Sequence, residues 1–141
     1  MCLNNWGGID HKVLEFHEYV NLFSGKSGSG KSTVMDAIQV ILYGSFSPSF
    51  LNKAADDAKN RRSVLSYLRG EQKDGSANRK DCDFCSVIAL EIEDTGTHII
   101  TCIGIAFEVR KSDSEIKKFV YFSHSGKMPE SEYLTLSLIH I

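Results

Sequence analysis

The spacing of hydrophobic residues changes along the chain and predicts strands at both ends of the sequence with helices between them. Residues 1–23 contain short apolar clusters at 13–16 and 19–23, and Gly7-Gly8 marks a turn between two short β elements. The run 19–23 (Tyr-Val-Asn-Leu-Phe) is therefore expected to form a strand.

Apolar residues in 33–43 recur at helical intervals and predict one helix with a single buried face. Gly44 is expected to end this helix. Asp36 and Gln39 lie off the apolar face, and Asp36 is expected to cap or pair locally without a catalytic role. The predicted buried face consists of Val34, Ala37, Ile38, Ile41 and Leu42.

A second helix is predicted over 57–68, with Val64, Leu65 and Leu68 on its buried side. The segment 45–49 before it contains Pro48 and is expected to be a loop. Residues 70–80 are polar, charged and contain glycine, which also favours a loop.

The second half of the chain alternates between apolar and polar residues and predicts three antiparallel strands, at 87–92, 99–109 and 116–122. Residues 94–97 supply a hairpin connection between the first two, and a polar turn at 111–115 precedes the third. The strand at 99–109 is expected to bury one face, formed by Ile99, Thr101, Ile103, Ile105, Phe107 and Val109.

Residues 25–32 (Gly-Lys-Ser-Gly-Ser-Gly-Lys-Ser) match the pattern G-x-x-x-x-G-K-[ST] in full, between the strand-like run and the first helix. Glycines let such a backbone wrap closely around an oligophosphate, and the amides of 27–32 are expected to point inward as an anion nest. The beginning of the helix adds unpaired N–H groups. A flexible Gly/Ser-rich linker is the alternative, but linkers do not usually run from a β-like segment directly into an amphipathic helix.

The motif therefore predicts a site for ATP and Mg²⁺. Lys31 is expected to reach the β- and γ-phosphates, and the Ser32 hydroxyl is expected to bind Mg²⁺. Lys26 either adds a phosphate contact or is solvated. The candidate nucleotide-binding residues are Gly25, Lys26, Ser27, Gly28, Ser29, Gly30, Lys31, Ser32 and Thr33.

Composition places the chain among globular proteins, because 42% of its 141 residues are hydrophobic and 24% are charged. The net charge of −2 gives no global electrostatic case for binding nucleic acid. Local basic residues at 59, 61, 62, 69, 79 and 80 fit a solvated helix face or loop. The sequence has no run of 18 apolar residues and no secretory signal, so we expect a cytoplasmic protein without a membrane segment.

Cysteine and histidine do not predict a metal site. The pair Cys82 and Cys85 forms a lone C-x-x-C without a second pair or histidines at ligand spacing, and two thiols at the entrance of a strand are expected instead. Trp6 is expected to pack in the core rather than to stack on adenine.

Several phrases around the motif carry a resemblance to a known family. They are Asn5-Trp6-x-x-Ile9-Asp10, residues 20–25, the P-loop, residues 33–39, Leu51-Asn52-Lys53-Ala54-Ala55 and Ser66-Tyr67-Leu68-Arg69-Gly70. Together they resemble the N-terminal half of an ABC-type ATPase head, and in particular the SMC-like proteins. Over roughly residues 3–123 the chain is similar to SbcC/MukB-like ATPases of the JetC type from anti-plasmid condensin systems.

The resemblance implies an α/β fold: a P-loop NTPase, here the N-terminal half of an ABC-type head with an antiparallel β meander, over residues 1–135. It implies ATP and Mg²⁺ as cofactors, and DNA as the partner of the complete, nucleoid-associated protein. The C-terminal half-head of the same polypeptide, a homodimer of heads and accessory subunits are further implied partners. The implied roles are chromosome or plasmid organisation, plasmid defence and double-strand-break repair.

The family's catalytic parts are not found in this sequence. It has no coiled-coil heptads, no L-S-G-G signature and no strand ending in Asp-Glu, since Ile92-Glu93-Asp94 leads into a hairpin. The Q-loop glutamine is unassigned because no glutamine follows Gln72. By family analogy, Arg61, Arg62 and Arg69 lie where such heads present arginines to nucleotide or DNA. No catalytic residue is therefore expected within this chain.

Two other functions stay open. A small self-contained P-loop kinase or GTPase would require a central parallel sheet and an acidic strand end. A non-enzymatic nucleotide-binding module would require neither.

The last six residues, 136–141 (Leu-Ser-Leu-Ile-His-Ile), are what CTG-TCT-CTT-ATA-CAC-ATC encodes, the mosaic end of a common sequencing-library transposon. We expect these residues to be adapter read-through, with the native sequence stopping at about residue 135. A native apolar strand is the alternative, and the codons would distinguish the two.

Overall fold

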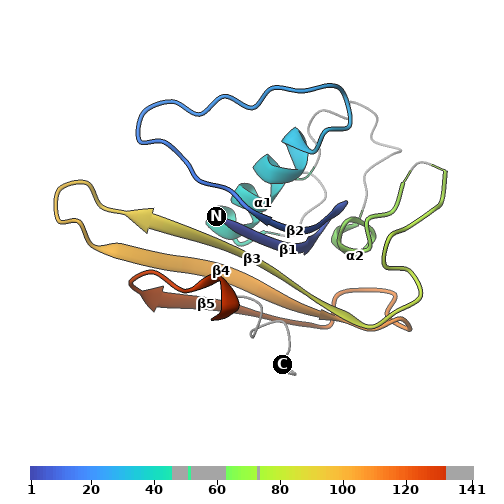
Figure 1. The fold of residues 1–141 in the computed structure, drawn as a ribbon. Coiled ribbons are helices and arrows are strands. Elements are labelled where there is room, and N and C mark those ends of the chain that lie inside the picture. Colours follow the sequence, from blue (N-terminus) through green and yellow to red (C-terminus); the bar gives the residue numbers. More distant parts are fainter. Residues whose placement is uncertain (46–50, 52–62, 73, 133–141) are drawn as a thin grey trace.

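Five strands pair in one sheet in the order β2-β1-β3-β4-β5, and every neighbouring pair is antiparallel. The computed structural model describes residues 1–45, 51, 63–72 and 74–132. Figure 1 shows β3, β4 and β5 as long strands beside the shorter hairpin of β1 and β2. The strands are β1 (Cys2–Trp6), β2 (Ile9–Val13), β3 (Phe84–Glu93), β4 (Ile100–Val109) and β5 (Lys118–Ser125). The predicted meander and the turn at residues 7–8 are confirmed. The predicted buried face of the strand at 99–109 is buried only at Ile105, Phe107 and Val109, since Ile99 and Thr101 are exposed and Ile103 is half-buried.

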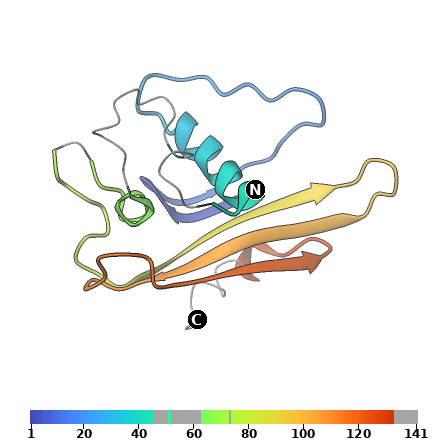
Figure 2. The same ribbon diagram turned by 180° about the vertical axis from the view of Figure 1, so that it is seen from behind.

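Helices α1 (Lys31–Tyr43) and α2 (Val64–Leu68) lie on the same side of this sheet in both views (Figures 1 and 2). Their apolar side chains share one core with the strands below, because each helix has an apolar face that must be removed from water. The most completely buried members of this core include Trp6, Ala37, Leu68, Ile88, Ile105 and Phe107.

Helix α1 ends where the sequence predicts. Gly44 adopts a left-handed conformation with φ of 59°, and its N–H donates to the carbonyl of Val40. The predicted buried face is wrong at three positions, because Leu42 is 54% exposed whereas Val40 and Asp36 are buried. The last turn of α1 therefore presents Leu42 to solvent instead of to the sheet.

The predicted strand at 19–23 is wrong. Residues 14–30 contain no helix or strand and arch from β2 to α1 (Figure 1). Tyr19 and Leu22 are each 87% exposed. A strand is stable only when its backbone groups pair with a neighbour, and none of the described strands pairs with this run.

The opposite face of the sheet carries a second, smaller cluster. Cys2, Ala89 and Cys102 are buried there, and Phe122 and Met128 pack against them. The backbone N–H of Met128 donates to the Glu91 carboxylate at 3.0 Å, which holds the segment after β5 against the sheet.

Helix α2 begins at a capped residue, since the Ser63 hydroxyl accepts from the N–H of Ser66 at 3.1 Å. Val64, Leu65 and Leu68 are buried as predicted. The rest of the predicted helix, 57–62, lies outside the described residues, as do the loop at 46–49, Arg61, Arg62 and the six residues 136–141.

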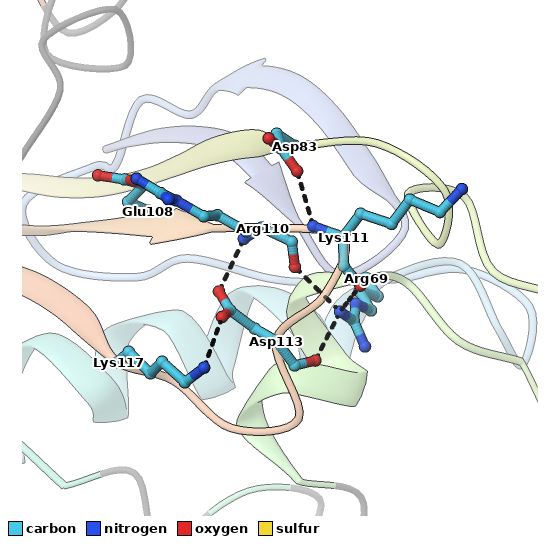
Figure 3. A network of polar contacts seen from close by, with 7 residues as sticks. All are labelled: Arg69, Asp83, Glu108, Arg110, Lys111, Asp113 and Lys117. Carbon is cyan, nitrogen blue, oxygen red and sulfur yellow. Dashed lines mark hydrogen bonds and ion pairs between the residues drawn. The ribbon is translucent and has the colours of Figure 1, made fainter.

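Arg69 directly follows α2 and binds the turn between β4 and β5. Its Nη2 donates to the carbonyl oxygens of Arg110, Lys111 and Asp113 at 3.2, 3.1 and 2.8 Å (Figure 3). The Asp113 carboxylate in turn accepts from the N–H of Arg110 at 2.8 Å and pairs with Lys117 at 3.2 Å. The guanidinium that family analogy assigned to nucleotide or DNA is therefore engaged with this turn.

Among the described residues, no helix has the length and apolar character needed to cross a membrane.

Candidate nucleotide-binding site

The loop of residues 25–30 has a backbone that requires its glycines. Gly25, Gly28 and Gly30 have φ of 149°, 83° and 89°, a region that side chains disfavour. A Cβ on Gly25 would also lie 2.7 Å from the Ser29 hydroxyl oxygen. The loop is closed by a bond from the N–H of Ser29 to the carbonyl of Lys26 at 3.2 Å. The sequence therefore forms a tight turn that leads into α1.

Gly30 is the N-cap of α1, and no side chain caps the helix there. The first N–H groups of α1 are consequently available to an anion, and no acidic residue lies in the first turn to repel one. Thr33 and Ser32 lie in this first turn, with Ser32 exposed.

Lys31 folds over the loop. Its Nζ donates to the carbonyls of Gly25 and Lys26 at 2.7 and 2.9 Å and lies 3.3 Å from the Ser29 hydroxyl. The ammonium is thus surrounded by three neutral oxygens of the loop, which accept its hydrogen bonds and leave its charge unpaired by any of these acceptors. A phosphate oxygen is a stronger acceptor for this group than a neutral carbonyl.

The loop forms one wall of a cavity of about 940 Å³. Residues 27–33 line that wall. The second wall comes from three separate segments: the turn between β1 and β2, the end of α2 with the residues after it, and the loop at 74–78. Its members are Gly7, Gly8, Ile9, Tyr67, Gly70, Glu71, Gln72, Asp74 and Asn78.

The two walls are joined at Gly7, which lies close to side chains of both α1 and α2. A Cβ there would lie 3.1 Å from Thr33 Cγ2 and 3.1 Å from Tyr67 Cε1. Gly70 approaches from the same side, since a Cβ on Gly70 would lie 2.7 Å from the Gly7 carbonyl oxygen. A Cβ has no room at Gly70 and would be tightly placed at Gly7, and both residues also have positive φ, which disfavours side chains.

Trp6 packs in the core as predicted. It is fully buried, and its ring centroid lies 4.8 Å from that of Tyr67. It is not among the residues that line the cavity.

Two carboxylates line the described cavity, and both accept local hydrogen bonds. Glu71 Oε2 accepts from the Ser66 hydroxyl at 2.5 Å. Asp74 accepts from the hydroxyl and the N–H of Ser76, and these bonds lower the pKa of the Asp74 carboxyl. Asp36, although buried, is not part of the lining.

Arg79 is the residue that sequence reasoning missed. The sequence places it in a polar loop and predicts a solvated side chain, but it is 6% exposed. Its Nε donates to the Leu68 carbonyl at 3.1 Å, Nη1 to Asp10 Oδ1 at 2.7 Å, and Nη2 to the Gly7 carbonyl. Its neighbours come from distant parts of the chain, so no local signal could have indicated the burial.

The C-x-x-C thiols lie apart from this cavity. Cys82 is exposed and precedes β3, whereas Cys85 is half-buried within β3, where burial raises the pKa of its thiol.

The residues fit a nucleotide with Mg²⁺. The positive-φ glycines permit a close approach of the backbone, and the uncapped helix start and the Lys31 ammonium are donors of the kind that a triphosphate requires. The Ser32 hydroxyl is exposed beside them and is of the type that binds Mg²⁺ in such loops.

Comparison with known proteins agrees with this geometry. Residues 1–58 match a family described as the P-loop containing region of AAA domain. The chain is 33% identical over 72 residues to the SbcC subunit of the nuclease SbcCD from Staphylococcus haemolyticus (strain JCSC1435). This match includes 48% of the chain and spans 6% of the length of that relative. Together the two findings support similarity to an SbcC-like ABC ATPase head at the level of the family.

Proposed function

We propose that this chain binds ATP with Mg²⁺ through residues 25–33, as the N-terminal half of an SMC-like ATPase head that acts on DNA. The observation that carries the proposal is the position of Lys31 Nζ, within 3.3 Å of three loop oxygens at one wall of a large cavity. A bound triphosphate would offer that ammonium charged oxygens in place of neutral ones.

In this proposal each part of the loop has a distinct role. The amides of 27–32 and the start of α1 hold the phosphates, Lys31 contacts the β- and γ-phosphates, and Ser32 binds the metal. Mg²⁺ supplies charge neutralisation between the phosphates. The nucleoside then occupies the remaining cavity, against the wall formed by Gly7, Tyr67 and Gly70.

Hydrolysis would need a carboxylate that orients water, and this chain is proposed to obtain it from the C-terminal half-head of the same polypeptide. The two carboxylates that line the described cavity already accept hydrogen bonds, Glu71 from the Ser66 hydroxyl and Asp74 from the Ser76 hydroxyl. The proposal also has a finer part. It includes the assignment to the JetC type, a homodimer of heads, accessory subunits, the nucleoid location, and roles in plasmid defence, chromosome organisation or break repair.

ATP binding tests the central part of the proposal. Titration of the full chain with ATP in the presence of Mg²⁺ should show saturable binding, and Lys31→Ala should weaken it by about 10- to 100-fold, as expected for loss of a charged hydrogen bond. Lys12→Ala is the matched control, because Lys12 is an equally charged side chain exposed on the edge strand β2. Equal affinities of the wild type and Lys31→Ala would contradict the proposal.

The same titration decides the role of Lys26, whose side chain either contacts phosphate or is solvated. Weaker ATP binding by Lys26→Ala would indicate that the Lys26 side chain contacts phosphate, and unchanged affinity would indicate that it is solvated. The Lys26 carbonyl that accepts from Lys31 is retained in this variant.

The sheet topology bears on the alternative of a self-contained P-loop kinase or GTPase. All strand pairs in the part of the chain that the structure describes are antiparallel, whereas that alternative requires a central parallel sheet. Turnover separates the remaining possibilities, because appreciable ATP hydrolysis by this chain alone would favour the self-contained enzyme. A heptad-rich reading frame downstream of residue 135 would favour the SMC-like head.

A further inference from the structure

Arg79 joins the hairpin of β1 and β2 to the end of α2, and both of these segments contribute to the second wall of the cavity. Its guanidinium donates to Gly7 in the turn between β1 and β2, to Leu68 at the end of α2, and to Asp10 at the start of β2. Its backbone N–H also donates to the Arg69 carbonyl at 3.0 Å. The side-chain contacts join positions that are 11 to 72 residues apart in the sequence.

The acceptors show which part of the site Arg79 controls. Gly7 lines the cavity, and Leu68 lies between two further lining residues, Tyr67 and Gly70. The approach of Gly70 to the Gly7 carbonyl leaves no space for a Cβ, so a small shift of either segment would change the shape of this wall. The described hydrogen bonds and ring contact of the Arg79 side chain do not involve the P-loop itself.

Arg79 has the physical properties of a rigid brace. It is 6% exposed, its guanidinium carbon lies 5.5 Å from the Phe84 ring centroid, and its fork reaches two backbone carbonyls at once. Asp10 contributes less to this brace, because its side chain is 83% exposed and such pairs are screened by water.

We infer that Arg79 is a positioning residue that presets the nucleoside-binding wall of the ATP site, and that it acts less on residues 25–33, which hold the phosphates and make none of the described contacts of its side chain. The inference rests on the proposed ATP binding and adds to it a division of labour within the site. The triphosphate is held by 25–33, and the nucleoside is held by a wall whose shape depends on the Arg79 guanidinium.

The test compares two ligands, Mg·ATP and Mg·tripolyphosphate, which share the phosphates and differ in the nucleoside. In the full chain, Arg79→Met should lower the affinity for Mg·ATP by about tenfold, which is the size of a lost charged hydrogen bond. The affinity of Arg79→Met for Mg·tripolyphosphate should stay within about twofold of the wild type, because the described contacts of the Arg79 side chain do not include residues 25–33. Arg79→Lys keeps the charge but not the fork, and it should show the same selectivity with a smaller factor.

Asp10→Asn is the matched control, since it removes the charge partner of Arg79 and leaves both backbone contacts. It should change neither affinity by more than about twofold. If Arg79→Met and Arg79→Lys lost affinity for both ligands equally, through unfolding or otherwise, the proposed positioning role of Arg79 would be overturned. Failure of the wild type to bind either ligand would refute the P-loop proposal itself, and the inference with it.

Discussion

The indole Nε1–H of Trp6 donates to the carbonyl oxygen of Thr33 at 2.8 Å. Trp6 ends β1, whereas Thr33 lies in the first turn of α1, directly after the P-loop motif. The bond therefore fixes the start of α1 to the sheet at the point where an anion would approach the helix. The packing of Trp6 on Tyr67 extends this link to α2.

Trp6→Phe tests this link. The variant loses the bond to Thr33 and part of a fully buried ring, so we expect the free energy of unfolding to fall by about 1–3 kcal/mol. Urea unfolding monitored by far-ultraviolet circular dichroism measures it. Tyr19→Phe, at a position 87% exposed, should stay within about 0.5 kcal/mol of the wild type. A Trp6→Phe variant as stable as that control would contradict the prediction.

Gly104 on β4 permits a close approach between strands. A Cβ there would lie 2.4 Å from Phe122 Cζ and 2.6 Å from the Ile88 carbonyl oxygen. We expect Gly104→Ala to lower the free energy of unfolding by about 1–3 kcal/mol through overpacking, as measured by urea unfolding.

Gly96→Ala is the matched control for Gly104→Ala, because its nearest contact would be an ordinary 3.5 Å from Asp94 Oδ1. Its effect should be within about 0.5 kcal/mol. Similar losses in both variants would mean that the approach of Phe122 to Gly104 is not the cause.

Asp113, in the turn between β4 and β5, makes the stability of the folded protein depend on pH. The N–H of Arg110, above all, and the Lys117 ammonium hold the pKa of the Asp113 carboxyl below its ordinary value. A lowered folded pKa stabilises the protein above the unfolded pKa of about 4, and the contribution is lost as the pH falls through the folded value.

Asp113→Asn should therefore melt at a lower temperature than the wild type near pH 7, and the difference should close as the pH falls below about 4. Thermal melts across this pH range measure the difference. Glu115→Gln, a change of the same charge at an exposed position of the same turn, should not reproduce the closing difference. A constant gap between wild type and Asp113→Asn at every pH would refute the assignment.

The cysteines should differ in reactivity. Burial raises the pKa of the Cys2 thiol to about 11, so very little thiolate exists at neutral pH, whereas Cys82 is exposed. Brief treatment of the native protein with iodoacetamide should modify Cys82 and leave Cys2 unmodified, as read by peptide mass spectrometry. Denaturant should remove the difference, and rapid native modification of Cys2 would show that the second cluster is open.

Local patterns predicted much of this fold because their physical causes are local. The helical spacing and Gly44 correctly predicted α1 and its end, and alternation predicted the meander of β3, β4 and β5. Gly25, Gly28 and Gly30 have the positive φ values that the phosphate-binding pattern suggests.

The run at 19–23 shows where such reasoning fails. Its composition favours a strand, but a strand also needs a neighbour with unpaired backbone groups, and β2 and β5, the edges of the described sheet, do not pair with it. The local sequence pattern shows which residues of the run are apolar, whereas the pairing of its backbone in a sheet depends on which other segments of the chain lie beside it.

The phosphate-binding loop, the helix that follows it and the antiparallel meander could all be read from the amino-acid order, since each arises from interactions between near neighbours in the chain. The second wall of the cavity, where Gly70 approaches Gly7 and Arg79 binds the Gly7 carbonyl behind the lining, became visible only once the chain was folded. These residues lie up to 72 positions apart. Their roles arise from close backbone approach and burial, which depend on how the segments pack and not on the identity of adjacent residues.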